Sequence, residues 1–60
     1  MNLPADDYIL LSLVNTKLRD NYGSLSDLCD GEDLEEREVT TRLAALGYSY
    51  DPSRNAFIVK

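Results

Sequence analysis

The sequence contains no histidine and no tryptophan, and it has one cysteine, three glycines and two prolines among its 60 residues. Without histidine, the chain lacks the side chain whose unperturbed pKa lies nearest to neutral pH. A single cysteine excludes an internal disulfide, and no Cys/His cluster of the kind that holds zinc is present. With few glycines and prolines and 43% hydrophobic residues, the composition is that of a folded domain rather than of a disordered or fibrous chain.

Long apolar runs are missing as well. The longest one, residues 8–14, is interrupted by Ser12 and is far too short to span a bilayer. The stretch that precedes it carries two acids and no basic residue, unlike a secretory signal. We therefore expect a cytoplasmic protein with a reduced thiol and no membrane contact.

Negative charge is concentrated in the middle of the chain. The formal net charge is −5, from 11 acidic and 6 basic residues. Residues 24–47 hold seven acids and two cations, so this segment alone carries a net −5 while the two ends nearly cancel. An acidic surface is repelled by phosphate backbones and anionic lipids, which argues against nucleic acid and membranes as partners.

The apolar spacing predicts three helices, over residues 5–22, 24–30 and 34–46. Ser24 with Asp27 resembles a capping box for the second helix, Gly31 is expected to end it, and Asp33 is the expected N-cap of the third. The inward positions expected on these helices are Leu10 or Leu11, Val14, Leu18, Tyr22, Leu25, Leu28, Cys29, Val39, Leu43 and Leu46.

After Gly47 the period changes to that of strands, and residues 48–59 read as a β-hairpin with its turn at Asp51–Asn55. An isolated hairpin is marginal in water, so it must pack on the helices. Asn15 is a weak helix former on the first helix. We interpret it mainly as a hydrogen-bonding tie to the hairpin, with a contact to a partner as the alternative.

The second and third helices are spaced like a helix-turn-helix unit. An apolar pair and a small residue, Cys29, precede an apolar turn residue, Leu34, and the inward residues Val39 and Leu43 follow it. A hairpin directly after the second helix of such a unit is typical of a winged helix. The predicted fold is a single domain over residues 1–60, mostly α (α+β): a three-helix, helix-turn-helix-like bundle with a C-terminal hairpin.

Several segments together resemble the small bacterial proteins of domain-of-unknown-function family 4250. They are residues 2–4, 9–12, 14–20, 24–25, 28–29 and 47–50, with Asn55 and Phe57, and residues 14–20 are the most specific. The resemblance implies a stand-alone bacterial, cytoplasmic protein of about this length and implies no activity. Asp7-Tyr8 departs from an Asp-Pro that is common in the family, which bears on where the first helix begins.

Residues that could carry chemistry are better explained by structure. Cys29 lies on an apolar helix face with no histidine to activate it, so a buried small side chain is the favoured interpretation. Around Gly31 the acids do not fall at the positions of an EF-hand loop, and we expect no metal site. A core of this size has little room for a substrate pocket, so we expect no enzyme, no cofactor and no small-molecule substrate.

Two surfaces remain as candidates for binding. Ile9 and Leu13 form an apolar strip beside the predicted core face of the first helix, which could meet a partner unless the hairpin covers it. The face that a DNA reader would use holds Arg37, Thr40 and Thr41, with Arg54 in the hairpin, but Glu35 and Glu36 lie beside them.

The favoured function is accordingly a non-enzymatic protein-interaction module whose partner is an unknown protein or a second copy of the chain. A winged-helix DNA-binding protein is the alternative, and an acidic mimic of nucleic acid is a further one.

Overall fold

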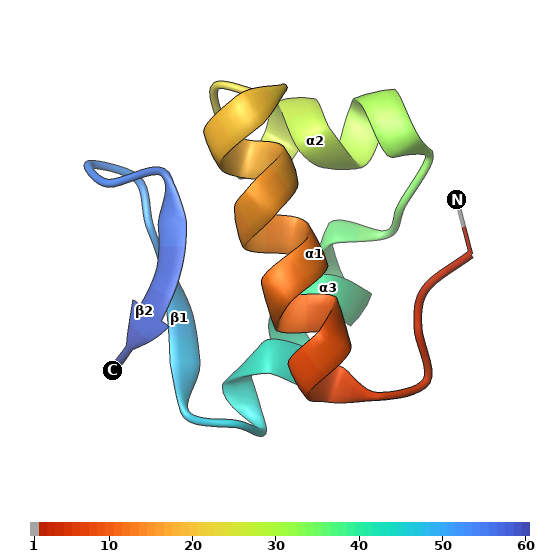
Figure 1. Cartoon of the computed structure of the whole chain (residues 1–60), viewed down its shortest axis with the longest axis vertical. Coiled ribbons are helices and arrows are strands. Elements are labelled where there is room, and N and C mark those ends of the chain that lie inside the picture. The colour runs from red at the N-terminus through yellow and green to blue at the C-terminus, as the bar shows by residue number, and fades with distance from the viewer. Residues whose placement is uncertain (1) are drawn as a thin grey trace.

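Helix α1, Asp7–Asp20, crosses the other two helices, and the hairpin stands at one side of them in the computed structural model (Figure 1). The structure describes residues 2–60. Helices α2, Leu25–Glu32, and α3, Glu36–Ala44, follow, and strands β1, Tyr48–Asp51, and β2, Ala56–Val59, close the chain. The mostly helical α+β fold predicted from the sequence is confirmed, and the hairpin has the predicted bounds.

The helix ends differ from the sequence-based bounds for local reasons. Helix α1 begins later because Asp6 is its N-cap and accepts hydrogen bonds from the backbone N–H groups of Tyr8 and Ile9. It ends at Asp20, with Asn21 as its C-cap, rather than at residue 22. Ser24 caps α2 as predicted, since its Oγ accepts a hydrogen bond from the Asp27 N–H at 3.1 Å.

The junction between α2 and α3 was predicted wrongly. Gly31 lies inside α2 rather than ending it, and Asp33 closes that helix from a left-handed conformation with φ 58°. Asp33 is therefore the C-cap of α2 and not the N-cap of α3, a position that Glu35 occupies without a side-chain cap. Aspartate is one of the few residues that tolerate positive φ, so it can do here what glycine usually does. Helix α3 also ends two residues early, at Ala44.

The core lies where the three helices and the hairpin meet. It is made of buried side chains from α1, α2, α3 and β2: Leu10, Val14, Leu18, Leu25, Leu28, Cys29, Val39, Leu43 and Phe57. All but Phe57 were expected from helical spacing. Leu34, in the three-residue connection between α2 and α3, packs against this core, and so do Tyr22 and Leu46. The inward positions predicted for a helix-turn-helix-like unit are thus occupied as expected.

Asn15 joins the middle of α1 to the hairpin. Its Nδ2 donates to the carbonyl oxygen of Phe57 at 3.1 Å, and the Phe57 N–H donates to its Oδ1 at 2.8 Å. One amide side chain therefore satisfies both main-chain groups of a strand residue, as a neighbouring strand would do. The tie between the first helix and the hairpin, predicted from Asn15, is confirmed.

A second asparagine joins the ends of two helices to the turn of the hairpin. Asn55, at φ 52°, donates through Nδ2 to the carbonyl oxygens of Leu18 and Tyr22 at the C-terminal end of α1. Its Oδ1 accepts from the Tyr50 hydroxyl at 2.7 Å, and that hydroxyl accepts from the Leu25 N–H at the start of α2. Main-chain groups that α1 and α2 leave unpaired at their ends are thus bonded by the hairpin.

Replacing Asn15 by aspartate tests the tie. We expect Asn15→Asp to lower the free energy of unfolding at pH 7 by about 2 kcal/mol, because an ionised carboxylate oxygen would face the Phe57 carbonyl without a proton between them. Protonation of the introduced carboxyl restores a donor, so its folded pKa is raised, and the stability it contributes is present at low pH and lost as pH rises. Urea unfolding of both proteins between pH 7 and pH ~4 checks this; a wild-type–variant gap that stays constant with pH would contradict it.

Candidate interaction surface

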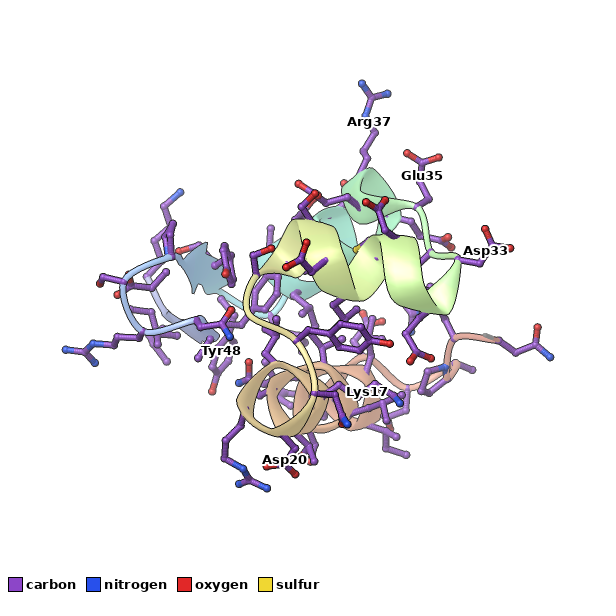
Figure 2. All side chains as sticks on the ribbon, turned by 90° about the horizontal axis from the view of Figure 1, so that it is seen from above. Lys17, Asp20, Asp33, Glu35, Arg37 and Tyr48 are labelled. Atoms are coloured by element: carbon purple, nitrogen blue, oxygen red, sulfur yellow. The ribbon has the colours of Figure 1, made fainter. Side chains whose placement is uncertain are left out.

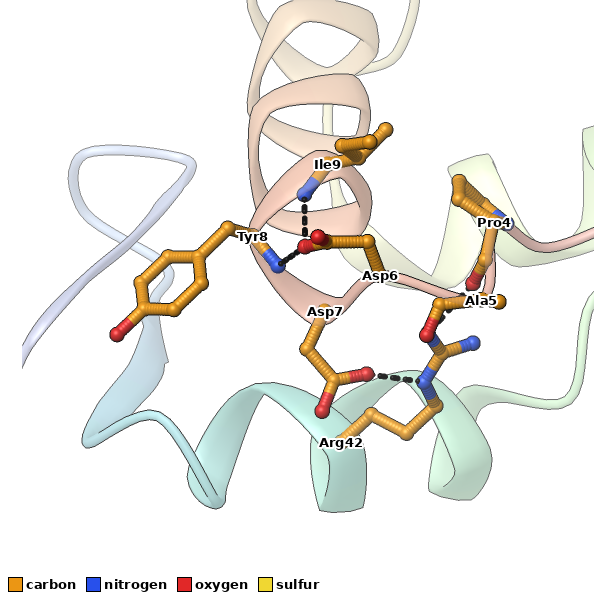
Figure 3. A network of polar contacts seen from close by, with 7 residues as sticks. All are labelled: Pro4, Ala5, Asp6, Asp7, Tyr8, Ile9 and Arg42. Carbon is orange, nitrogen blue, oxygen red and sulfur yellow. Dashed lines mark hydrogen bonds and ion pairs between the residues drawn. The ribbon is translucent and has the colours of Figure 1, made fainter.

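Arg42 of α3 holds the N-terminal end of α1 in place (Figure 3). Its Nε lies 2.7 Å from Asp7 Oδ1, and its Nη2 donates to the carbonyl oxygens of Pro4 and Ala5 at 2.5 and 3.1 Å. Both side chains of this ion pair are largely buried, with 21% and 33% of their area exposed. The first turn of α1, with Asp6 as its cap, is therefore fixed from two sides. The sequence reasoning did not identify Arg42, because its partners lie more than 30 residues away.

Tyr8 and Ile9 leave this fixed turn toward solvent. Tyr8 is 65% exposed and Ile9 is 58% exposed, whereas the next residue, Leu10, is completely buried. Leu13, one turn after Ile9, is partly buried. The hairpin does not cover Ile9, so the side chain stays on the surface. Tyr8 was not named among the candidates, although it opens the apolar run 8–14.

Two shallow hollows lie on the outer side of α1, one on either side of Tyr8. One of about 520 Å³ is lined only by α1 and its cap, including Ile9 and Leu13. The other, of about 740 Å³, is a groove between α1 and the hairpin, and its lining includes Leu11, Tyr48 and the two arginines Arg19 and Arg54. No acidic residue lines the groove. We call Tyr8, Ile9 and Leu13, together with these two hollows, the outer face of α1.

The four residues proposed for contact with DNA do not form a basic surface. Figure 2 shows Arg37 projecting into solvent beside Glu35, while Lys17 lies on the opposite side of the molecule. Thr40 is half-buried, and its hydroxyl donates back to carbonyl oxygens of its own helix. Thr41 is exposed. Arg54 lies in the hairpin turn, 3.7 Å from Asp51 Oδ2.

Cys29 is buried at the centre of the fold, with 4% of its area exposed. Burial raises the pKa of its thiol, and the carboxylates of Glu36, Asp30 and Glu35 raise that pKa further. The neutral thiol is therefore favoured, which is the opposite of what a nucleophilic cysteine needs. Residues 2–60 contain no group of three His, Cys, Asp or Glu side chains placed to hold a metal ion.

A polar cluster on the other side of α1 ties its end to α2. The Tyr22 hydroxyl donates to Glu32 Oε2 at 2.6 Å, and Lys17 Nζ lies 3.5 Å from the same oxygen. Gly31 lets the Tyr22 ring pack closely against α2, because a Cβ there would lie 2.6 Å from Cε1 of that ring. The hydrogen bond from Tyr22 lowers the pKa of the Glu32 carboxyl, and Lys17 lowers it further. The same bond raises the pKa of Tyr22.

This cluster predicts a specific dependence of stability on pH. Because the pKa of Glu32 is below its ordinary value of 4.5, the stability it contributes is present above that pH and is lost as pH falls through the folded-state pKa. We expect Tyr22→Phe to be less stable than the wild type at pH 7 and to lose less stability on acidification. Melting temperatures measured by circular dichroism from neutral pH to about pH 3 test this.

Tyr8→Phe is the matched control for this experiment, since it removes the hydroxyl of an exposed tyrosine on α1. Its melting temperature should follow that of the wild type at every pH. Parallel curves for Tyr22→Phe and the wild type would show that the bond to Glu32 does not contribute.

No helix within residues 2–60 is both long and apolar enough to cross a membrane. Comparison with curated proteins and with solved structures gives no match. The family model described as "Domain of unknown function (DUF4250)" matches residues 4–57, which is most of the chain and includes every helix and most of the hairpin. The resemblance found in the sequence is thereby confirmed, and the chain belongs to the DUF4250 family.

Proposed function

We propose that this chain is a non-enzymatic protein-interaction module, and that the outer face of α1 binds an amphipathic segment of a partner protein whose polar side is acidic. The observation that carries the proposal is the exposure of Tyr8 and Ile9 on a rigid helix turn. Large apolar side chains exposed on a small protein are typical of interaction sites, where aromatic residues contribute strongly.

The chemistry of the partner follows from the charges around this face. The groove beside Tyr8 is lined by Arg19 and Arg54, whose side chains are each 73% exposed. Their ion pairs with Asp20 and Asp51 are on the surface, where such pairs contribute little, so carboxylates of a partner could join them. Most of the acids lie in residues 24–47 and not in this groove. A partner segment with an apolar ridge flanked by acidic side chains would therefore fit this groove.

DNA binding by the helix-turn-helix-like unit is the weaker candidate. The arrangement of α2, α3 and the hairpin favours it, since a winged helix presents its second helix to the major groove. The charge opposes it, because Glu35, Glu36 and Glu38 surround Arg37, the one cation at the start of α3. Non-specific affinity for DNA depends on cations facing phosphates, and these acids would repel them.

A photo-crosslinking residue placed at Ile9 tests the proposal in the cells from which the chain comes. We expect a defined adduct whose crosslinked peptide, identified by mass spectrometry, comes from an acidic amphipathic segment of another protein. Adding Leu13→Glu should reduce the adduct at least tenfold, because it puts a charge into the apolar strip next to partner acids.

The matched control carries the same photo-crosslinking residue at Ser26, which is exposed on α2. Thr41→Glu, on the exposed side of α3, serves as the control for the added charge. Equal labelling from positions 9 and 26, or an adduct indifferent to Leu13→Glu, would contradict the proposal. An adduct joining two copies of the chain would also contradict it, by identifying a different occupant.

A further inference from the structure

The two outer edges of the hairpin differ in their hydrogen bonding to the rest of the fold. In the register of the hairpin, Ser49 pairs with Ile58 and Asp51 with Ala56, and the Lys60 N–H donates to the Gly47 carbonyl at 3.0 Å. Because hydrogen-bonded pairs alternate along antiparallel strands, the peptide groups of Ser49 and Asp51 face β2, and those of Tyr48 and Tyr50 face away from it.

The outer edge of β2 is closed where Phe57 bonds to Asn15. On the outer edge of β1, the peptide groups of Tyr48 and Tyr50 have no hydrogen-bond partner among residues 2–60. Natural sheets usually protect such an edge by keeping the strand very short or with a charge, a proline or a bulge. Strand β1 is short, at four residues, but Tyr48-Ser49-Tyr50 carries no charge, proline or bulge, and the only charged residue of the strand is Asp51 at its end.

We propose that the outer edge of β1 pairs with the same edge of a second copy of the chain, antiparallel and across a two-fold axis at Ser49. Tyr48 then lies opposite Tyr50 of the second copy and exchanges two main-chain hydrogen bonds with it, and the symmetric pair adds two more. The two hairpins form one four-stranded sheet. This inference does not depend on the proposed function, because it uses main-chain groups of β1 and not the side chains of Tyr8, Ile9 and Leu13.

Side chains at this edge are compatible with their own copies. Ser49, which meets itself at the axis, is small. Asp51 falls opposite Gly47 of the second copy, which has no side chain, and beyond it on the same face lies Lys60 of the second copy. Strands two apart are separated by about 10 Å, within reach of a lysine and an aspartate side chain together. Each dimer thus gains two oppositely charged Asp51–Lys60 pairs across the axis.

The length of the edge sets the expected affinity. Four-residue strands bury less area than the ~1,200–2,000 Å² of a stable protein interface, so the dimer should be weak and dependent on concentration. Sedimentation equilibrium of the whole protein should show a monomer at about 1 μM and a growing dimer fraction toward about 1 mM, the range set by an interface of this size.

A disulfide across the axis tests the register. In the proposed pairing Ser49 and its copy form a non-hydrogen-bonded pair with Cα atoms about 4.5 Å apart, a distance that a disulfide spans. With Cys29→Ala to remove the native thiol, Ser49→Cys should oxidise to a covalent dimer at least ten times faster than the control Ser53→Cys. Ser53 is exposed in the hairpin turn and does not face the axis.

Backbone methylation tests the hydrogen bonds without changing a side chain. The 60-residue chain is short enough for chemical synthesis, and N-methylation of Tyr50 removes an outward N–H while leaving the hairpin ladder intact. We expect this protein to stay monomeric and folded at about 1 mM. N-methylation of Val59, whose N–H lies on the outer edge of β2, is the matched control and should still dimerise.

A wild-type protein that is monomeric at about 1 mM would overturn the inference, as would equal oxidation rates for Ser49→Cys and Ser53→Cys. A dimer that is insensitive to N-methylation of Tyr50 but lost in Ile9→Glu would place self-association on α1 instead, and would overturn it too. Photo-crosslinking from position 9 can be repeated in the chain N-methylated at Tyr50. If the partner is still labelled there, failure of the dimer and failure of the proposed function can be told apart.

Discussion

The hairpin keeps its place because α1 supplies the hydrogen bonds that a third strand would otherwise supply. Two strands of four residues are too little to be stable in water alone. Asn15 pairs with both main-chain groups of Phe57, and this fixes the strand whose side chain completes the core. Asn55 and Tyr50 then bond the hairpin turn to the ends of α1 and α2. These polar bonds add to the packing of Phe57, Tyr48 and Tyr50 on the core in positioning the hairpin.

That arrangement has consequences for both surfaces of the hairpin. A side chain rather than a strand closes the outer edge of β2, so the sheet has two strands, and the outer edge of β1 is open. Because α1 lies beside the hairpin at Asn15, its outer face and the turn of the hairpin border one groove, with Tyr8 at one end and Arg54 in its lining.

Charge is distributed in a way that agrees with this division. The acids of residues 24–47 lie on α2, on α3 and in their connection, whereas the groove beside α1 has arginines and no carboxylate in its lining. The ion pair of Arg42 and Asp7 is largely buried, and its guanidinium also bonds the carbonyl oxygens of residues 4 and 5. These bonds satisfy most of its donors, so the pair fixes the first turn of α1 without an unpaired buried charge.

Sequence alone determined the helical core, because the core follows the period of the apolar residues. It also determined the bounds of the hairpin from its turn residues, and the hydrogen bonds of Asn15 to the hairpin from the presence of a weak helix former on the first helix. It also located the apolar strip at Ile9. Only the tertiary structure decided where α2 ends: the helix continues through Gly31, which was expected to end it, and closes at Asp33 in a left-handed conformation. It alone decided the partners of Arg42, Tyr22 and Asn55, since each bond joins residues at least ten positions apart and no local pattern encodes such distances. The open edge of β1 likewise became visible only once the register placed the peptide groups of Tyr48 and Tyr50 on the outside.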